Sequence, residues 1–372
     1  MFTLRQKTHE VQVKRIGILT CGGDCAGLNA VIRSVTQCAI LKHGWEVYGI
    51  RNGTVGLLTD PPMVEKLDVN FKGIGHALLR MGGTILGSTS KGNPFSYKKE
   101  DGTFEDCSQK AIDTFHKLGL DALIAVGGDG GLKIMSQLAE QGNINLVGIP
   151  KTIDNDISHT ESIGFSTAVE VATYALDGLQ PTAASHDRVM ILEVMGRDAG
   201  HIALNAGIAG GADVILIPEI PFNLKHITHK IQSVIQKGRN FSLVVVAESA
   251  HMEDLDPLMV TYQDGSERYG GIGDFISRKL NEIMNVETRS MALGHIQRGG
   301  QPIANDRIMA AAFGVKAVEL VAEGKFGRMV AWQNRSVTDL PLKEAIGSYQ
   351  RVDLDGSLVA TARGLGISLG DE

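Results

Sequence analysis

The fold is indicated most clearly by two neighbouring segments: Ala122-Leu-Ile-Ala-Val-Gly-Gly-Asp-Gly-Gly131 and Leu146-Val-Gly-Ile-Pro-Lys-Thr-Ile-Asp-Asn-Asp156. Each begins with a short apolar run without period-2 alternation, which is typical of a strand buried on both faces of a parallel sheet. Each run then gives way to glycine or charged residues. Because ligands bind beyond the carboxyl ends of such strands, the two segments predict a parallel sheet with a binding site along one edge.

The same design continues along the chain. Amphipathic stretches alternate with further apolar runs, which predicts βαβ units and an α/β fold with mostly parallel sheets. The further strands are expected at 16–20, 46–50, 189–194, 214–217 and 242–247, and the helices at 29–41, 132–140, 166–179, 225–236 and 306–323. At 372 residues the chain exceeds the usual size of one hydrophobic core, so two lobes are expected.

Composition excludes several classes of partner. The formal net charge of −6 argues against nucleic acid or an anionic membrane as the main partner. The first fifteen residues are too polar for a signal peptide, and no apolar run approaches the length of a membrane span. The cytoplasm is therefore the expected compartment.

Charged residues gather directly after the strand at 146–149. Lys151, Asp154 and Asp156 place one cation and two carboxylates at the strand end. A cation can face phosphate, and a carboxylate can accept a proton from an attacking hydroxyl, so the cluster indicates phosphoryl transfer. The alternative is a polar loop whose aspartate and asparagine side chains close turns.

Glycine turns followed by an aspartate occur twice, as Gly22-Gly23-Asp24 and as Gly127-Gly128-Asp129. Backbone N–H groups at such turns can bind phosphate, and Asp129 is well placed to hold a metal ion. The alternatives are a tight turn needed only for packing at the first site and a helix-capping Asp129 at the second.

Arginines lie at strand ends or glycine turns of this acidic protein: Arg188, Arg197, Arg289 and Arg298. A single one is expected to be solvated or salt-bridged, but four in such places indicate phosphate binding, because the planar guanidinium grips phosphate oxygens. Glu248, at the end of the run 242–247, is suited to accept a sugar hydroxyl or to cap the next helix.

Taken in order, these motifs resemble the 6-phosphofructokinase family over about residues 15–334. The segments that carry the resemblance are Gly22-Gly23-Asp24, Gly127-Gly128-Asp129-Gly130, Pro150-Lys-Thr-Ile-Asp-Asn-Asp156, Ile163-Gly-Phe165, Glu193-Val-Met-Gly-Arg197 and Leu293-Gly-His-Ile-Gln-Arg-Gly-Gly300.

The resemblance implies two Rossmann-like, three-layer α/β lobes with the active site in the cleft between them. Residues 1–164 and 297–347 would form the larger lobe, for the phosphate donor, and residues 165–296 and 348–372 the smaller lobe, for the sugar phosphate. The implied reaction is magnesium-dependent transfer of a phosphoryl group to the 1-hydroxyl of fructose 6-phosphate, a glycolytic step.

The resemblance also assigns roles to residues. Asp154 matches the general base, supported by Asp156 and Thr152, and Asp129 matches the residue that positions magnesium. The implied donor site comprises Gly23, Lys91, Gly128, Asp129, Gly130, Gly131 and Lys151. The implied sugar-phosphate site comprises Thr152, Asp154, Arg188, Met195, Gly196, Arg197, Glu248, His295 and Arg298, together with Arg289. Arg188 and Arg289 would reach it from a neighbouring subunit, which implies a homotetramer.

Departures from the family pattern concern the phosphoryl-facing loop and the effector site. The loop after Ser88 reads Thr89-Ser90-Lys91, so two alternatives are open: Lys91 substitutes for the usual arginine, or that role lies elsewhere. The first helix keeps Arg33 but has Gln37 where bacterial enzymes have a second arginine, which puts control by their usual effectors in question.

The phosphate donor depends on two positions. Pyrophosphate users have a second aspartate where this chain has Gly130, whereas Lys151 is the residue that pyrophosphate users share. The mixed pair resembles an ATP-using branch close in sequence to the pyrophosphate users. Because a buried unpaired charge repelling phosphate costs several kcal/mol, Gly130 outweighs Lys151 and predicts ATP.

Three other functions stay open: a reversible pyrophosphate-dependent transferase, a non-catalytic regulatory or nucleotide-binding subunit, and an NAD-dependent Rossmann dehydrogenase. The retained Asp129, Asp154, Asp156 and Arg197 argue against a subunit that only binds ligands. The dehydrogenase fits poorly, because no acidic ribose contact is clearly placed about twenty residues after the first glycine turn.

Overall fold

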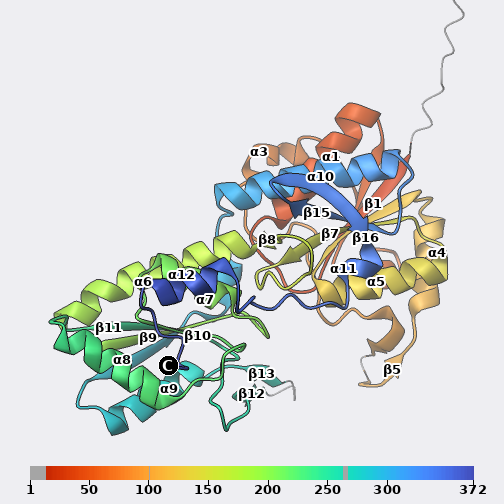
Figure 1. The fold of residues 1–372 in the computed structure, drawn as a ribbon. Coiled ribbons are helices and arrows are strands. Elements are labelled where there is room, and N and C mark those ends of the chain that lie inside the picture. The colour runs from red at the N-terminus through yellow and green to blue at the C-terminus, as the bar shows by residue number, and fades with distance from the viewer. Residues whose placement is uncertain (1–13, 100, 263–266) are drawn as a thin grey trace, which may run out of the picture.

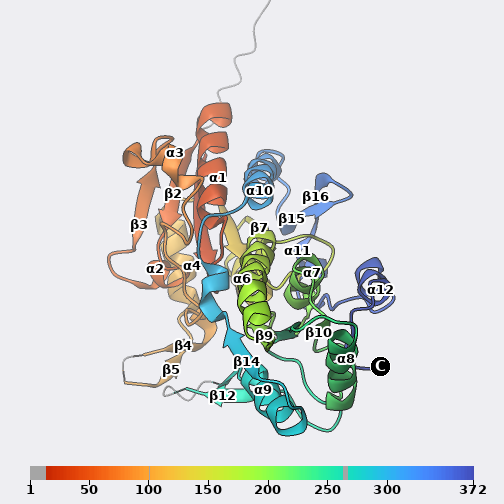
Figure 2. The same ribbon diagram turned by 90° about the vertical axis from the view of Figure 1, so that its left-hand side faces the viewer.

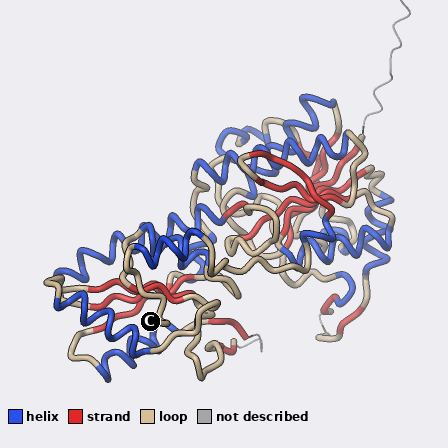
Figure 3. The backbone as a smooth tube through the Cα atoms, in the orientation of Figure 1, coloured by secondary structure: helices blue, strands red, loops and turns tan. Residues whose placement is uncertain are grey.

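The computed structural model describes residues 14–99, 101–262 and 267–372. Two mostly parallel sheets, each covered by helices on both faces, form two lobes that lie side by side (Figures 1 and 3). This confirms the predicted α/β class with mostly parallel sheets. The polar stretch that argued against a signal peptide lies, as far as residue 13, outside the described residues.

The large sheet has eight strands in the order β16-β15-β7-β6-β1-β2-β3, with β8 paired to β7. Its pairs are parallel except β2–β3 and β15–β16. The strands are β1 (Arg15–Cys21), β2 (Glu46–Ile50), β3 (Val64–Leu67), β6 (Ala122–Gly127), β7 (Leu146–Thr152), β8 (Ile163–Gly164), β15 (Arg328–Gln333) and β16 (Ser336–Pro341).

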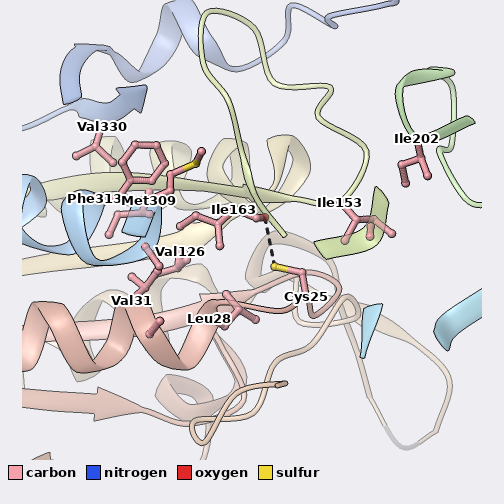
Figure 4. Close-up of a cluster of buried hydrophobic side chains, with 14 of the residues drawn as sticks. Cys25, Leu28, Val31, Val126, Ile153, Ile163, Ile202, Met309, Phe313 and Val330 are labelled. Atoms are coloured by element: carbon pink, nitrogen blue, oxygen red, sulfur yellow. Dashed lines mark hydrogen bonds between the residues drawn. The ribbon is translucent and has the colours of Figure 1, made fainter. Parts of the chain in front are cut away.

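Helices cover both faces of this sheet. On one face α1 (Leu28–His43) packs along α10 (Ala304–Ala322), and on the other lie α4 (Ser108–Lys117), α5 (Asp129–Gly142) and α11 (Leu342–Ala345) (Figures 1 and 2). Figure 4 shows the core under the first face, where Val31 of α1, Phe313 of α10 and Val330 of β15 pack together, all with no exposed surface.

The small sheet has four parallel strands in the order β10-β11-β9-β14. They are β9 (Val189–Val194), β10 (Val214–Leu216), β11 (Ser242–Ala247) and β14 (Thr288–Ala292). One face is covered by α6 (Phe165–Ser185), α7 (His201–Ala209) and α12 (Ser357–Gly364), and the other by α8 (Leu224–Gln236) and α9 (Ile272–Ile283) (Figure 1).

Short elements complete the described chain. They are α2 (Val55–Leu58), η1 (Phe71–Gly73), α3 (Gly75–Leu78), η2 (Pro94–Ser96), β4 (Tyr97–Lys98), β5 (Phe104–Glu105), β12 (Met259–Thr261), β13 (Glu267–Tyr269) and η3 (Gly294–Arg298). Strands β4 and β5 form one antiparallel pair, and β12 and β13 form another. None of the helices in the described ranges combines the length and the apolar character needed to cross a bilayer.

The chain passes between the two sheets more than once. It leaves the large sheet after β8 and returns to it through η3 and α10, which lead to β15 and β16. Residues 346–352, here called the crossing segment, then lead from α11 to the small lobe, where Val352 donates its N–H to Glu219 at 2.9 Å. The residue boundaries predicted for the lobes stay a prediction.

Most of the strands that are buried on both faces were predicted, and five strands of the two main sheets were missed. Strands β2, β9 and β11 have the predicted limits, whereas β3, β8, β14, β15 and β16 were not expected. Strand β15 lies inside the sheet, and its apolar residues 329–332 were overlooked. For β3, β14 and β16 the cause is physical, because β3 and β16 lie at sheet edges and four of the five β14 residues are exposed. Their residues therefore lack the continuous apolar pattern of a strand buried on both faces.

Candidate active site

A cavity of about 1020 Å³ lies at the carboxyl ends of strands from both sheets. The register explains why these strand ends meet. Cys21 of β1 pairs with Gly127 of β6, and Gly127 pairs with Pro150 of β7, so the loops that follow start at one level. In the small sheet Val194 of β9 pairs with Ala247 of β11, which brings the next loops together in the same way.

The structure brings most of the predicted site residues to this cavity. Those that line it are Gly23, Gly128, Asp129, Gly130, Gly131, Lys151, Thr152, Asp154, Asp156, Met195, Arg197, Glu248, His295 and Arg298. Four predicted residues are not among the lining residues: Lys91, Arg188, Gly196 and Arg289. The roles of all these residues stay predictions.

The first glycine turn is held by two cations. The Lys151 ammonium donates to the Gly23 carbonyl, and Arg298 Nη1 donates to the Asp24 carbonyl at 3.1 Å. A Cβ on Gly23 would lie 2.8 Å from Arg298 Nη1. The absence of a side chain at Gly23 thus leaves room for the arginine in this position, so packing and charge act together at this turn.

The second glycine turn packs against the first strand. A Cβ on Gly127 or Gly131 would come within 2.6 or 2.7 Å of Cys21 Sγ, whereas a Cβ on Gly130 would meet no atom within 4 Å. Burial raises the pKa of the Cys21 thiol to about 11, so it packs as a neutral group. Only Gly130 of these three glycines has open space toward which a side chain could extend.

Asp129 does not cap a helix, contrary to the alternative drawn from the sequence. Helix α5 begins at Asp129 itself, and its N-cap position is Gly128. One carboxylate oxygen of Asp129, Oδ1, accepts a hydrogen bond from the Gly347 N–H of the crossing segment at 2.8 Å. The other carboxylate oxygen of Asp129 can contact a cation. Mg²⁺ is commonly held by one or two carboxylates plus water and phosphate oxygens.

The carboxylates after β7 are buried. Asp154 is 6% and Asp156 4% exposed. The Asp154 N–H donates to Thr152 Oγ1 at 3.1 Å, and that hydroxyl lies 3.3 Å from Asp154 Oδ2. Within the described ranges, Asp154 Oδ1 is buried without a hydrogen-bond partner. A free carboxylate oxygen in a cavity wall is suited to accept a proton from a ligand.

Electrostatics tune Asp154 further. Burial and the neighbouring Asp156 raise the pKa of Asp154 to about 6, while Arg298 and Arg197 act in the opposite direction. A carboxyl group with this pKa is ionised at neutral pH yet more basic than an ordinary aspartate. The group therefore has both properties of a general base.

Glu248 faces Asp154 from the small lobe. Its Oε1 accepts hydrogen bonds from the backbone N–H groups of Gly196 at 3.3 Å and Arg197 at 3.0 Å. Burial raises the pKa of Glu248 to about 7, although the Arg197 N–H bond opposes the rise. The Met195 N–H donates to Gln297 Oε1 at 2.7 Å, so the whole turn after β9 is fixed by side chains from other segments.

Arg188 and Arg289 lie together away from the cavity. Arg188 pairs with Glu287 through bonds of 2.8 and 3.2 Å, and Arg289 pairs with the same carboxylate. A single chain thus does not bring them to the site, and their predicted action across a subunit boundary stays a prediction. Lys91 follows Thr89 and Ser90, which do line the cavity, and its N–H bonds Thr89 Oγ1 at 3.1 Å.

Sequence reasoning missed three residues around Arg197: Asp198, Tyr269 and Tyr349. Tyr269 donates to Asp198 Oδ1 at 2.6 Å, and Tyr349 donates to Oδ2 at 3.4 Å. Asp198 directly follows Arg197, which was predicted as a site residue, so its position in the sequence could have indicated it. The tyrosines had none, because their contacts depend on segments far away in the chain.

Known proteins match this chain along nearly its full length. The family model described as phosphofructokinase matches residues 15–321. The protein named ATP-dependent 6-phosphofructokinase 1 of Synechocystis is 56% identical, over 97% of this chain and 99% of its own length. The protein named ATP-dependent 6-phosphofructokinase 2 of Clostridium perfringens is 46% identical, over 96% of this chain and 99% of its own length.

Solved structures of phosphofructokinases are also similar to this chain. The structure of Pichia pastoris phosphofructokinase in the T-state has a TM-score of 0.76 and 30% identity, covering 96% of this chain. This chain spans only 37% of the length of that Pichia chain. The pyrophosphate-dependent enzyme of Marinobacter aquaeolei, at TM-score 0.76 and 24% identity, covers 96% of this chain and 88% of its own and shares the fold. The chain belongs to the phosphofructokinase family.

Proposed function

We propose that the protein is an ATP-dependent 6-phosphofructokinase, which transfers the γ-phosphoryl group of ATP to the 1-hydroxyl of fructose 6-phosphate. One observation carries the proposal: the buried Asp154 carboxyl, with its free oxygen and raised pKa of about 6, lies in one cavity with two glycine turns and Arg197. The names of the Synechocystis and Clostridium relatives, both ATP-dependent 6-phosphofructokinases, support both substrates.

In this proposal Asp154 accepts the proton of the attacking hydroxyl through its free oxygen Oδ1. Its raised pKa makes the transfer more favourable than for an ordinary aspartate, and general base catalysis contributes about 10²–10⁴-fold. Thr152 holds the second carboxylate oxygen, and Asp156 adds the like charge that keeps the pKa high. The sugar hydroxyl is thus deprotonated as it attacks, and the proton stays on the enzyme.

Other cationic and acidic side chains of the cavity would contact the substrates. Arg197 contributes a positive charge opposite Asp154 and is suited to the oxygens of the transferring group. His295 and Arg298, from η3, would contact the sugar phosphate, and Glu248 would accept a sugar hydroxyl. Arg298 also donates to the Asp24 carbonyl, so one residue of the proposed sugar-phosphate site is hydrogen-bonded to the first glycine turn of the donor site.

ATP as the donor is supported by Gly130 and by the surroundings of Lys151. The position of a Cβ on Gly130 is open, so no side chain stands where the α-phosphate of ATP would lie. The ammonium of Lys151 donates to the Gly23 carbonyl, so part of its bonding capacity is used to fix the first glycine turn. A supporting role in the turn reconciles this lysine with ATP.

Asp129 would hold Mg²⁺, and its single carboxylate fits an ion that keeps several waters and binds substrate phosphates. Bound there, Mg²⁺ supplies charge neutralisation on the phosphate oxygens. The protein's own contribution is orientation, because the Gly347 N–H fixes one carboxylate oxygen of Asp129.

Assembly and regulation are proposed on narrower grounds. A homotetramer would bring Arg188 and Arg289 into the site of a neighbouring subunit. A second cavity, of about 480 Å³, is lined by Arg33, Gln37, Lys72 and His76 among others, which supports an effector site at the two helix residues named from the sequence. Because Gln37 carries no charge, we expect a weaker response to phosphorylated effectors than a two-arginine site gives. The cytoplasm stays the expected compartment.

The test is to measure initial rates of fructose 1,6-bisphosphate formation from fructose 6-phosphate and Mg²⁺, with ATP and pyrophosphate in parallel. Turnover with ATP alone supports the proposal. Turnover with pyrophosphate alone would make Lys151 the residue that sets the donor and the enzyme a reversible one. Activity with neither donor would favour a regulatory subunit.

A further inference from the structure

Asp198 is a carboxylate at which three separate segments meet. It lies in the turn after β9, and its Oδ1 accepts the Tyr269 hydroxyl of β13 at 2.6 Å. Its Oδ2 accepts the Tyr349 hydroxyl of the crossing segment at 3.4 Å. The same Oδ2 lies 3.6 Å from Arg197 Nε. Each oxygen therefore has a phenol donor, and one also faces the arginine.

Arg197 needs such support. Its backbone has a φ of 51°, a left-handed conformation that persists only where the surroundings impose it. Glu248 holds its N–H, but its side chain is 65% exposed. Within the described parts of the chain, Asp198 is the sole ion-pair partner of the Arg197 guanidinium. Without Asp198 the long side chain would sample many rotamers.

We propose that Asp198 is a positioning residue: held by the Tyr269 and Tyr349 hydroxyls, it sets the Arg197 guanidinium against Asp154 and the sugar-phosphate site. This inference rests on the proposed kinase function for its kinetic consequences. It also assigns a role to strand β13 and to the crossing segment, since each contributes one tyrosine to the same carboxylate.

The hydroxyls of Tyr269 and Tyr349 stay protonated beside the Asp198 carboxylate. The hydrogen bond to Asp198, together with burial, raises the pKa of Tyr269 to about 12, and burial and the nearby Asp156 raise the pKa of Tyr349. Both hydroxyls therefore stay protonated and donate throughout the physiological range. Tyr349 also interacts with Asp156, so Tyr269, at 2.6 Å, is the stronger of the two donors to Asp198.

Kinetics of D198N give the first test. We expect kcat/KM for fructose 6-phosphate to fall about 10- to 100-fold, the range for losing hydrogen bonds to a charged group, with the KM for ATP unchanged. Y269F should act in the same direction but less, and D198N/Y269F should be no worse than D198N alone. Matched controls are D177N and Y174F on exposed positions of α6, which should leave both parameters unchanged.

Additive effects in the double variant, or an equal loss of affinity for ATP and sugar phosphate, would overturn the proposal. Either result would mean that Asp198 acts through general stability or independently of Tyr269. Y269F keeps the test valid if D198N fails to fold, because it removes one hydroxyl and retains the charge.

The pH profile separates positioning from simple charge removal. The charged groups that face Asp154 are Asp156, Arg197, Arg298 and Glu248. If Arg197 moves away in D198N, Asp154 loses a nearby cation and the acid limb of kcat/KM shifts to higher pH. Removing a negative charge without moving Arg197 would shift it to lower pH. An upward shift supports the proposal, and a downward or absent shift contradicts it.

A readout without turnover distinguishes this inference from the proposed function. Hydrogen exchange of the ligand-free protein should increase around Tyr269 and Tyr349 in D198N, but not in D177N, even if the wild-type protein proves inactive with both donors. Unchanged exchange at both tyrosine segments would show that Asp198 does not hold them.

Discussion

The donor side and the sugar side of the cavity are built differently. The donor side consists of two glycine turns that pack on one another through Cys21, with backbone groups fixed by Lys151 and Arg298. The sugar side consists of side chains, Arg197, Glu248 and others, delivered by separate segments of the chain. The donor side is therefore sensitive to added atoms, and the sugar side to lost contacts.

The difference follows from what each side must recognise. Phosphates of a nucleotide can be held by repeated backbone N–H groups, which require close approach and hence glycine. A sugar phosphate whose hydroxyl reacts needs a proton acceptor and cations at distinct points, which only side chains provide. Substitutions on the two sides should accordingly fail in different ways.

The largest effect is expected at the point where the two sides meet. Asp154→Ser should lower kcat by about 100-fold or more, because it removes the proton acceptor, while the affinity for fructose 6-phosphate stays nearly unchanged. Steady-state rates and calorimetric binding measure the two quantities, with Asp177→Ser as a control on exposed α6. Near-normal turnover would show that another group accepts the proton.

The next effect should be confined to the donor. Gly130→Asp places a carboxylate in open space near the expected α-phosphate, so kcat/KM for ATP should fall about 100-fold, since an unpaired charge repelling phosphate costs several kcal/mol. Gly130→Ala is the matched control and should retain ATP use. Sugar-phosphate binding by both variants should be normal, and undiminished ATP turnover by Gly130→Asp would place the donor elsewhere.

Packing of the donor turn gives a smaller effect, on stability. Gly127→Ala puts a Cβ 2.6 Å from Cys21 Sγ and should lower the free energy of unfolding by about 1–3 kcal/mol. Adding Cys21→Ala should recover part of the loss. The matched control is Gly178→Ala in α6, where a Cβ meets nothing within 4 Å and should stabilise the helix. Equal effects of the two alanines in denaturant titrations would contradict the packing argument.

The smallest expected change is a dependence on pH. Below about pH 6 Asp154 becomes protonated, so kcat/KM for fructose 6-phosphate should fall on the acid side. Folding stability changes with pH in the opposite direction to activity. The pKa of Asp154 is higher in the folded state than in the unfolded chain, so its ionisation destabilises the fold as pH rises from about 4 to 6. Asp154→Ser removes this penalty and should gain on the order of 1–2 kcal/mol over wild type between pH 4 and 7.

Unfolding titrations of the wild type and of Asp154→Ser at pH 4, 5 and 7 measure this gain. A variant that loses stability relative to wild type as pH rises would mean that the buried carboxylate is better solvated than its burial implies.

Much of the donor side could be predicted from the sequence alone. The turns after β1 and β6 follow continuous apolar runs, and parallel strands align their carboxyl ends, so Gly23, Asp129 and Asp154 were expected at one edge. Local composition suffices when one segment supplies both the strand and the site. Edge strands such as β14 were not predicted, because strands with exposed residues lack a continuous apolar run.

What the sequence by itself determined is the α/β class, the family and the chemical character of the residues after β1, β6, β7 and β9. What only the tertiary structure decided is how distant segments satisfy those residues: Gly347 beside Asp129, Glu248 under the Arg197 backbone, and Tyr269 with Tyr349 on Asp198. The physical reason is that hydrogen bonds between segments depend on the packing of whole lobes, which no local pattern records.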